Sequence, residues 1–376
     1  MSNDSTDASD SNAIDALRKR LDAIDSSLVS LAAERQRVVS EIGRSKQKQG
    51  RQLRDFQRER AVLDHVRGKA LELALDPDLA EDLLKRLIDA SLTRQEQERA
   101  QLSAHGTGRR ALVIGGAGRL GGWLASFLDN QGFELLLADL SFAQNSQQQF
   151  RDWRDAPDDV DLIVLATPIA VTVDVLKALT ERGHRGLILE VASIKSPLIG
   201  PLRQAAEAGL NICSVHPMFG PDTRLLSGRH VLFMDVGNPE AVDQAEALFT
   251  QTMAEIKRID IDDHDRLVAW VLGLSHAVNI AFFTAINQSG ISAADLAEVS
   301  STTFNRQLAI ARDVASENPD LYFEIQQLNE YGGEPRRTLL EAVRSLHESV
   351  EAGDLEAFRA RMRQGRDYLA DPRLSS

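Results

Sequence analysis

The chain has 376 residues, of which 43% are hydrophobic, and its formal net charge at pH 7 is -13. One hydrophobic core rarely serves a chain of this length, so two or three domains are expected. The negative charge excludes a general nucleic-acid binder, because no broad basic surface is left to neutralise a phosphate backbone. The lone cysteine, Cys213, excludes a disulfide framework and favours a reducing cytoplasm, and we expect no metal site.

The first hundred residues carry helical patterns and no strand signal. Residues 1–11 are polar and acidic, and we expect them to form a disordered tail. The next apolar residues are spaced alternately by four and three, which is typical of a coiled-coil-like helix. They are Leu17, Leu21, Ile24, Leu28, Leu31, Val38 and Ile42. A turn near Gly50 ends this helix, and two more helices are expected at about 55–75 and 76–102, so residues 1–104 are predicted to form an all-helical domain.

Polar side chains interrupt the apolar faces of these helices. Arg35 occupies a position where the pattern calls for an apolar residue, and a desolvated guanidinium is costly without an anionic partner. Lys46 lies about 20° from Arg35 around the helix, so both cations point the same way. Ser91 and Gln95 interrupt the apolar stripe of the third helix. These features indicate an anion-binding pocket; a helical hairpin whose Arg35 pairs with a neighbouring glutamate and whose Lys46 is solvated is the alternative.

The pattern changes after a short linker at residues 103–108. Five apolar runs then alternate with helical stretches, which is the signature of a parallel, doubly wound α/β sheet. The runs are residues 111–114, 135–138, 162–166, 187–191 and 212–215. Two further strands are expected at 229–236 and 255–259, which places a Rossmann-type domain at 105–260 and an all-helical domain at 261–376.

A stretch without charged residues lies between Arg266 and Asp295 in this last domain. Its length would suit a membrane span, but it contains polar residues such as His276 and Asn279. We therefore interpret it as a helix that is buried on all sides, in part by a second subunit, rather than as a helix in lipid.

A glycine motif directly follows the first predicted strand. Gly116, Gly118 and Gly121 form the pattern G-x-G-x-x-G, which makes a tight turn, admits a pyrophosphate and allows close helix packing. Asp139 ends the next strand about 20 residues further on, where a carboxylate can bind ribose hydroxyls and repel a 2′-phosphate. The sequence therefore predicts NAD as cofactor; a structural turn followed by a solvated aspartate is the alternative.

Two more predicted site segments reach the same edge of the sheet. Thr167 and Pro168 end another strand beside the expected cofactor crevice, although Pro168 also suits a simple loop. His216 ends the fifth apolar run, where a neutral imidazole can accept the proton of a substrate hydroxyl while its carbon loses hydride to NAD. A packed structural histidine is the alternative.

The residues around this histidine resemble the prephenate dehydrogenase family. The resemblance rests on H-P-M-F-G-P-D at 216–222 and A-S-I-K at 192–195, and it extends from about residue 111 to the carboxyl-terminal helices. It implies that His216 accepts the proton of the prephenate 4-hydroxyl and that Ser193 helps to orient both the histidine and this hydroxyl. It also implies that Arg306 binds a substrate carboxylate and that His276 lies near the substrate; a solvated arginine and a core histidine are the alternatives.

The helical domain resembles the all-helical chorismate mutase family from residue 12 to about residue 102. Eight positions carry the residue types of that family's site: Arg18, Arg35, Lys46, Asp55, Arg58, Glu59, Ser91 and Gln95. The resemblance implies that these residues bind chorismate and hold it in the compact conformation that rearranges to prephenate.

The resemblance also implies individual roles in that site. Arg18 and Arg35 hold carboxylates, while Lys46 and Gln95 face the ether oxygen, where negative charge develops. Glu59 and Ser91 hold hydroxyl groups or orient their neighbours. Arg18 lies about 100° around the helix from Arg35, and the family solves this with an intertwined dimer in which Arg18 reaches the partner's site.

Together the two resemblances identify the chain as a member of the bifunctional chorismate mutase/prephenate dehydrogenases, which make and then consume prephenate. They imply a homodimer, and they leave open whether tyrosine is a feedback inhibitor. A dehydrogenase with a non-catalytic helical module, an arogenate dehydrogenase and a hydroxyacid dehydrogenase are the alternatives. The chain departs from the family pattern at residues 329–335, where two glycines and a proline predict a break in a helix.

Overall fold

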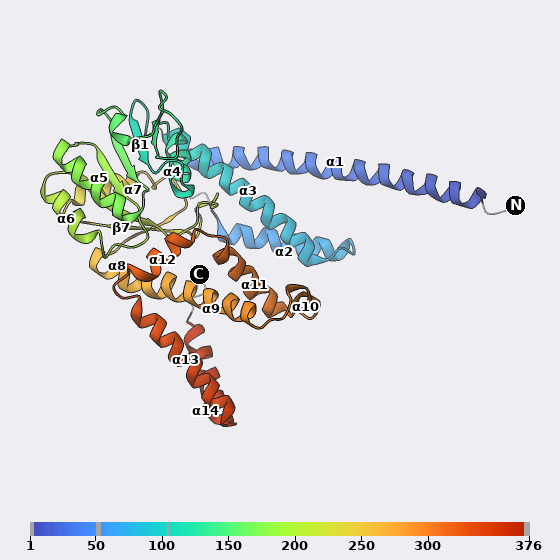
Figure 1. Cartoon of the computed structure of the whole chain (residues 1–376). Coiled ribbons are helices and arrows are strands. Elements are labelled where there is room, and N and C mark those ends of the chain that lie inside the picture. The colour runs from blue at the N-terminus through green and yellow to red at the C-terminus, as the bar shows by residue number, and fades with distance from the viewer. Residues whose placement is uncertain (1–3, 50–53, 104, 372–376) are drawn as a thin grey trace. The chain divides into compact units, whose positions relative to one another are not determined.

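The computed structural model describes residues 4–49, 54–103 and 105–371 (Figure 1). Contacts divide the chain into two compact units. The helical unit comprises residues 1–104 with the short segments 223–227 and 251–253, and the sheet unit comprises the rest. The expected limit at residue 260 lies inside the sheet unit, and the division into three domains stays a prediction.

Within the described residues, the helical unit is built from α1 (Asp4–Lys48), α2 (Phe56–Glu72) and α3 (Pro77–Ser103). Helix α3 packs against both α1 and α2. Asp55 caps α2, because its carboxylate accepts a hydrogen bond of 3.0 Å from the backbone N–H of Arg58. Pro77 begins α3, where its missing N–H would have no partner within the helix. The predicted all-helical domain is confirmed.

The expected disordered tail is wrong for residues 4–11, which form the first turns of α1. A helix that is already nucleated gains one hydrogen bond for each residue it adds, so a long helix extends over a polar flank. Residues 1–3 of the expected tail lie outside the described residues.

In the described part of the chain, the sheet unit contains an eight-stranded sheet with the order β3-β2-β1-β4-β5-β6-β7-β8. The strands are β1 (Arg110–Ile114), β2 (Glu134–Ala138), β3 (Gln149–Phe150), β4 (Leu162–Leu165), β5 (Leu187–Glu190), β6 (Asn211–Pro217), β7 (His230–Met234) and β8 (Glu255–Arg258). Helices α4 (Arg119–Asp129), α5 (Ile169–Arg182), α6 (Ile199–Glu207) and α7 (Pro239–Ala247) alternate with them. The predicted doubly wound sheet is confirmed, with one difference: β7 runs antiparallel to β6, so the sheet is mixed.

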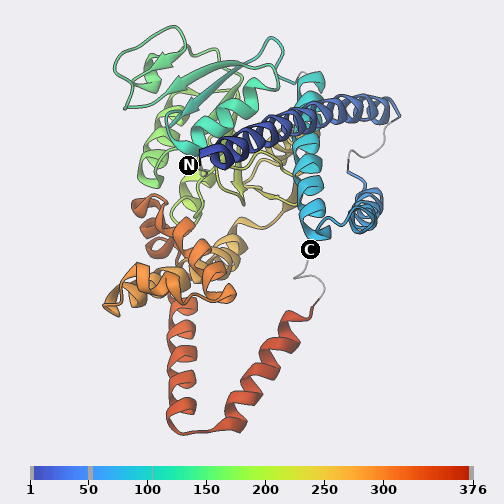
Figure 2. The ribbon, with the colours of Figure 1, turned by 90° about the vertical axis from the view of Figure 1, so that its right-hand side faces the viewer.

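Helices after β8 complete the sheet unit. They are α8 (Ile261–Val268), the π-helical segment η2 (Ala269–Leu274), α9 (Ser275–Gln288), α10 (Ala293–Glu298), α11 (Thr302–Ala315), α12 (Pro319–Gln327), α13 (Gly333–Glu351) and α14 (Leu355–Leu369). Helices α13 and α14 form a hairpin that extends away from the sheet (Figure 2). The predicted helix break is confirmed at residues 328–332, while Pro335 lies in the first turn of α13, where proline is tolerated.

Most of the uncharged stretch lies in one continuous helix from Ile261 to Gln288. Among the described residues it is the one helix long and apolar enough to cross a membrane, which by itself is weak evidence for a span. The expectation of burial on all sides is wrong for the single chain, because Leu267, Trp270 and Val271 are exposed. Helices α11, α12 and α13 contact other parts of this helix, and the exposed side chains leave an apolar surface.

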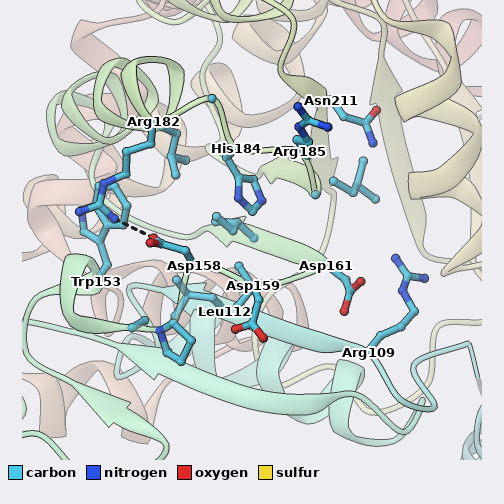
Figure 3. A pocket seen from close by; sticks show the side chains of 18 of the residues that line it. Arg109, Leu112, Trp153, Asp158, Asp159, Asp161, Arg182, His184, Arg185 and Asn211 are labelled. Carbon is cyan, nitrogen blue, oxygen red and sulfur yellow. Dashed lines mark hydrogen bonds and ion pairs between the residues drawn. The ribbon is translucent and has the colours of Figure 1, made fainter.

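A cavity of about 950 Å³ opens at the amino edge of the sheet, where β1, β4, β5 and β6 begin (Figure 3). Its charged side chains are largely engaged with protein groups: Arg182 pairs with Asp158 at 3.3 Å, and Asp159 pairs with Arg110 at 2.7 Å. Ligands of doubly wound sheets bind at the opposite, carboxyl edge. This cavity is therefore not the candidate cofactor site.

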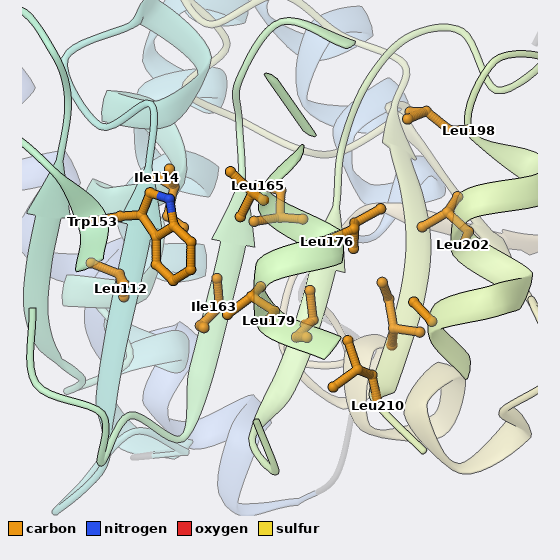
Figure 4. Close-up of a cluster of buried hydrophobic side chains, with 14 of the residues drawn as sticks. Leu112, Ile114, Trp153, Ile163, Leu165, Leu176, Leu179, Leu198, Leu202 and Leu210 are labelled. Carbon is orange, nitrogen blue, oxygen red and sulfur yellow. The ribbon is translucent and has the colours of Figure 1, made fainter. Parts of the chain in front are cut away.

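The core of the sheet unit lies where α5 and α6 cover the strands (Figure 4). Leu112 of β1 and Ile163 of β4 belong to the same buried cluster as Leu176 and Leu179 of α5 and Leu202 of α6. Leu176 and Leu179 are three residues apart, so they share one helix face. Each such side chain contributes about 1.5–3 kcal/mol on burial, and the packed layer holds the carboxyl ends of the strands in place.

Candidate active sites

The carboxyl ends of β1, β4, β5 and β6 open into a cavity of about 700 Å³ within the sheet unit. The glycine loop, the segments that follow these strands, and helices α9 and α12 line it. Eight of the predicted site residues line this cavity: Gly118, Gly121, Asp139, Thr167, Pro168, Ser193, His216 and His276. The structure therefore brings together residues that the sequence assigned separately to the cofactor and to the substrate.

The glycine loop leaves room for a ligand against the backbone. Gly115 has a φ of +88°, and a Cβ there would collide with the carbonyl oxygen of Ala166. A Cβ at Gly121 would collide with the Gly115 carbonyl, so this glycine allows α4 to pack closely. Gly118 is the N-cap of α4 and offers no side-chain cap, which leaves backbone N–H groups available to a phosphate.

The left-handed turn falls on Gly115 rather than on Gly116, to which the sequence motif assigns it. The physical reason is that the chain reverses directly after β1 ends at Ile114, one residue before the motif begins. The space around Gly116 is also restricted, since a Cβ there would lie 3.1 Å from the carbonyl oxygen of Val113.

Asp139 follows β2 and is held by backbone donors. Its two carboxylate oxygens accept hydrogen bonds from the N–H groups of Ala117, at 3.1 Å, and Ser141, at 2.9 Å. Thr167 lies on the other side of β1, where its hydroxyl contacts that of Thr172 at 2.8 Å, and Pro168 is the N-cap of α5. A dinucleotide with a free ribose 2′-hydroxyl fits this arrangement of the glycine loop, the uncapped amino terminus of α4 and the carboxylate that follows β2.

His216 is buried in the wall of the cavity and forms a chain of hydrogen bonds. Its Nδ1 lies 2.9 Å from Nε2 of His264, and Nδ1 of His264 lies 2.6 Å from Oδ1 of Asp265. Asp265 also accepts hydrogen bonds from the backbone N–H groups of Lys195, at 2.9 Å, and Ser196, at 2.6 Å. The Nε2 atom is thus the ring nitrogen of His216 that remains for a substrate.

The surroundings keep the two histidines neutral. Burial, together with the nearby His264 and the Lys195 ammonium, holds the pKa of His216 well below its ordinary value of 6.5. Burial is also the largest cause that lowers the pKa of His264, and it outweighs the opposing effect of Asp265. Burial alone would raise the pKa of Asp265, but hydrogen bonds from His264, Ser196 and the backbone lower it below its ordinary value.

A buried ion pair supports the floor of the cavity. Lys195 and Glu190 are fully buried, with 2.8 Å between Nζ and Oε2. Ser214 donates to the same Glu190 oxygen at 2.7 Å, and the carbonyl oxygen of Val215 accepts from Nζ at 3.1 Å. Because each partner has further hydrogen bonds, this pair satisfies the condition under which buried charges are tolerated.

The helical wall of the cavity carries an aromatic stack and a cation. The rings of His276 and Tyr322 lie 4.1 Å apart between centroids, and burial lowers the pKa of His276 to about 4. Arg119, at the start of α4, pairs with Asp222 at 2.6 Å and with Glu317 at 2.7 Å. Arg306 is exposed on α11 and lies outside the cavity of its own chain, so its predicted role stays a prediction.

The helical unit gathers part of its predicted site on α1 and α3. The Arg35 guanidinium donates to the carbonyl oxygen of Leu87, at 3.1 Å, and to the Ser91 hydroxyl, at 3.0 Å. Gln95 is buried and donates from Nε2 to the carbonyl oxygen of Val39 at 2.7 Å. Burial lowers the pKa of Arg35, which indicates a guanidinium withdrawn from water with no carboxylate from the described part of the chain paired to it. The expected alternative, in which Arg35 pairs with a glutamate, is not what the structure shows.

The remaining mutase-type residues lie elsewhere in this unit. Glu59 forms an ion pair with Arg54 at 3.0 Å, and Asp55 is occupied as the cap of α2. Lys46 is half-buried near the end of α1, whereas Arg18 is exposed and pairs with Asp15 at 3.3 Å. Arg58 follows Asp55 in the first turn of α2. The roles of these residues stay predictions.

The fold and the cavity define a dinucleotide-dependent dehydrogenase that is joined to a helical domain. Family models agree with both parts: chorismate mutase type II matches residues 17–96, and the nucleotide-binding and dimerization domains of prephenate dehydrogenase match 127–258 and 260–364. The glycine motif lies just ahead of the second match.

Known relatives span the same two parts. The T-protein of Enterobacter agglomerans is 26% identical over 360 residues, which covers 95% of this chain and 93% of the relative. The T-protein of Haemophilus influenzae is 25% identical, with 83% and 81% covered. The prephenate dehydrogenase of A. aeolicus, solved in complex with hydroxyphenyl propionate and NAD+, shares the fold at 17% identity and a TM-score of 0.56, covering 69% of this chain and 97% of that one.

The chain belongs to the bifunctional enzymes that combine a type II chorismate mutase with an NAD-dependent prephenate dehydrogenase. The alternative of a dehydrogenase with a non-catalytic helical module is thereby disfavoured, because the helical part matches a mutase model in its own right.

Sequence reasoning missed His264, Asp265 and Glu190. The contacts of His264 with His216, and of Asp265 with Lys195, join residues 48 and 70 positions apart. No local motif marks such a pair. An acidic helix start that contains one histidine, directly after the last strand, was the available signal.

Proposed function

We propose that His216 is the base of the dehydrogenase and that Ser193 orients the substrate beside it. The observation that carries this proposal is a buried histidine, kept neutral, in the wall of a cavity that also holds the glycine loop. Bound NAD supplies the hydride acceptor. His216 takes the 4-hydroxyl proton of prephenate on Nε2 as the carbon loses hydride, and the ring carboxylate leaves as carbon dioxide because the ring becomes aromatic.

For the mutase, we propose that the residues around Arg35 bind chorismate and stabilise its transition state. The rearrangement needs no proton transfer, so the site has to hold the compact conformer and meet the charge on the ether oxygen. Arg35 and Ser91 are already joined by a hydrogen bond, which supports a shared role at a carboxylate or hydroxyl. Gln95 and Lys46 would face the ether oxygen, and Glu59, with Asp55 and Arg58, would hold the remaining polar groups.

We propose that the active enzyme is a homodimer. The apolar stripe of α1 is exposed in the single chain, with Leu17 at 64% and Leu21 at 57%, and such a long apolar stripe calls for a partner. Arg18 lies on this exposed part of α1 and would enter the mutase site of the second copy. Arg306 lies in the region that matches the dimerization domain, and we propose that it meets a substrate carboxylate in the assembled dimer.

Tyrosine as a feedback inhibitor and a cytoplasmic location are also proposals. The product of the dehydrogenase lies directly before tyrosine, which gives feedback a chemical rationale. The buried Cys213, whose pKa burial raises to about 12, suits a reducing compartment because it forms no disulfide in the described residues.

Two variants test the proposed roles of His216 in the dehydrogenase and Arg35 in the mutase, because each should impair one activity only. His216→Ala should lower dehydrogenase kcat by roughly 10²–10⁴-fold, as expected for a lost general base, and leave chorismate turnover unchanged. Arg35→Ala should lower mutase kcat/KM by roughly 10²–10³-fold and leave prephenate oxidation unchanged. Assays of NADH formation, carbon dioxide release and chorismate loss measure both.

Exposed residues provide matched controls for this pair. His230→Ala removes a histidine that is exposed on β7 and paired with Glu255, and Arg37→Ala removes an exposed arginine on α1. Both controls should keep both activities. Full dehydrogenase activity of His216→Ala would refute its role as base, and oxidation of arogenate or a hydroxyacid in preference to prephenate would change the substrate.

A further inference from the structure

We propose that His264 and Asp265 form a relay that positions His216, holding its proton on Nδ1 so that Nε2 is the free base. The proposal rests on the proposed role of His216. His264 and Asp265 act through His216 and not on the substrate, so they are positioning residues.

The hydrogen-bond partners of Asp265 determine the direction of the relay. Its carboxylate receives donors from the backbone of Lys195 and Ser196 and from the Ser196 hydroxyl. A carboxylate surrounded by donors is an acceptor, so Nδ1 of His264, at 2.6 Å, must carry a hydrogen and donate it.

The protonation state of His264 then follows. Neutral imidazole carries one hydrogen, so with Nδ1 protonated its Nε2 is an acceptor. Nδ1 of His216, at 2.9 Å from that nitrogen, therefore donates. His216 is left with a lone pair on Nε2, which is the state that can take a hydroxyl proton.

The relay also stabilises the product of proton transfer. When His216 gains a proton it becomes a buried cation, and the Asp265 carboxylate compensates that charge through the polarised His264 ring, without itself being protonated. Lys195 is the cation that opposes this charge, but its ammonium is already paired with Glu190 at 2.8 Å. Asp265 is thus the carboxylate that compensates the charge on His216, to which it is linked through His264.

The helix break at residues 328–332 has a place in this arrangement. Asn329 is buried in the break and donates from Nδ2 to the carbonyl oxygen of Asp265 at 2.9 Å. The backbone N–H of Glu330 points to the Ser196 hydroxyl at 3.5 Å. An uninterrupted helix would not present these donors, so the break clamps the segment that carries the relay.

Asp265→Asn tests the direction of the relay with a side chain of the same shape. The Ser196 donors hold the amide oxygen, which turns the amide N–H₂ toward His264 and forces its hydrogen onto Nε2. That ring then donates to His216 and moves the His216 hydrogen onto the nitrogen that faces the substrate. Dehydrogenase kcat should fall by roughly 10²–10⁴-fold, with KM for prephenate and NAD within about threefold of the original and chorismate turnover unchanged.

His264 variants separate positioning from packing. In His264→Gln the amide oxygen can accept from His216 Nδ1, so we expect a loss of only about tenfold, whereas His264→Phe should lose about 10²-fold or more. Asp265→Asn added to His264→Gln should cost little further, because the relay is already cut. If His264 had a purely structural role, the losses of activity would instead follow the losses of thermal stability, and His264→Gln would be no more active than His264→Phe.

The outcomes distinguish this proposal from the role of His216 itself. If His216→Ala is inactive but Asp265→Asn keeps kcat within about threefold, the relay is wrong and the base assignment stands. If His216→Ala is fully active, the base assignment fails first. Additive losses in the double variant would also overturn the relay. Chorismate turnover by the same purified chain reports that the helical unit of each variant is intact, and calorimetric unfolding reports that its sheet unit is folded.

Discussion

The two units solve different chemical problems with polar groups of different kinds. In the sheet unit, His216 is 3% exposed and kept neutral by burial, as a base for proton transfer must be. In the helical unit, the buried polar groups that face the predicted site are Ser91 and Gln95, which do not change charge near neutral pH. A redox step coupled to proton transfer needs a tuned base, whereas a rearrangement needs fixed charges and donors.

The units also differ in how complete each site is within one chain. The cavity at the sheet edge collects eight predicted residues in a single chain. In the helical unit, hydrogen bonds join Arg35 of α1 to Ser91 of α3, and Gln95 of α3 to the backbone of α1. Arg18, by contrast, lies on an exposed stretch of α1. This contrast predicts that dilution to monomers harms the mutase, which loses Arg18, more than the dehydrogenase, which loses Arg306 but keeps its cavity.

Replacing Gln95 by glutamate, which has the same shape, would give the mutase site a side chain that titrates. Gln95 donates one hydrogen of its amide to the carbonyl oxygen of Val39, and in the proposed mutase site the second would be donated to the substrate. Gln95→Glu places a carboxyl there that must be protonated to donate. Mutase kcat/KM should therefore fall by roughly 10²–10³-fold at pH 8 and recover as the pH is lowered toward 5, while the original enzyme stays nearly flat.

The measurement is a pH profile of chorismate turnover, with prephenate oxidation as the internal control. Gln49→Glu, at an exposed position beyond α1, is a matched control that should leave the profile unchanged. A Gln95→Glu enzyme with the original flat profile would show that this side chain does not donate to the substrate.

Removing the Asp139 charge tests how the sheet unit selects its cofactor. Asp139→Asn keeps the shape of the side chain but no longer repels a 2′-phosphate. We expect KM for NAD to rise about tenfold and the preference for NAD over NADP to fall by at least about tenfold, since one such contact is worth about 1.4 kcal/mol. Steady-state kinetics with both cofactors measure this.

Ser141→Ala is the control for the loop, because Asp139 binds the backbone N–H of Ser141 and not its hydroxyl. That variant should keep both kinetic constants. An Asp139→Asn enzyme with unchanged KM for NAD and unchanged selectivity would remove Asp139 from the ribose site.

Local patterns in the sequence predicted the fold well. The helices of the amino-terminal unit follow from the apolar period, and α2 and α3 begin at Phe56 and Pro77, each within one residue of the expected start. The strand β3 escaped prediction because Gln149 and Phe150 are too few to show a period. The antiparallel direction of β7 escaped it as well, because an apolar run carries no information about strand direction.

The candidate site was predictable where a motif places residues at one sheet edge. The cluster of His216, His264 and Asp265 was not, because its hydrogen bonds join three segments that only the folded sheet unit brings together. The exposure of Leu267 and Trp270 was missed for a related reason. Composition shows that a helix must be covered, but not whether its own chain covers it.

The buried His276 of the sheet unit affects the stability of the fold as the pH changes. Burial lowers the pKa of His276 to about 4, against an ordinary value of 6.5. The unfolded chain binds a proton at this histidine more readily than the folded one does, so its contribution to stability is complete above pH 6.5 and is lost as the pH falls toward 4. His276→Phe keeps a ring to stack on Tyr322 and removes the titration.

We expect this variant to recover about 1 kcal/mol of the stability that the sheet unit loses between neutral pH and pH 4.5, after allowance for solvent screening. Calorimetric unfolding at several pH values measures it, with His347→Gln at an exposed position of α13 as the control. The recovery should be partial, because His216 and His264 also have lowered pKa values and lose stability in the same direction. An acid-induced loss identical to that of the original enzyme would mean that His276 is not held neutral in the fold.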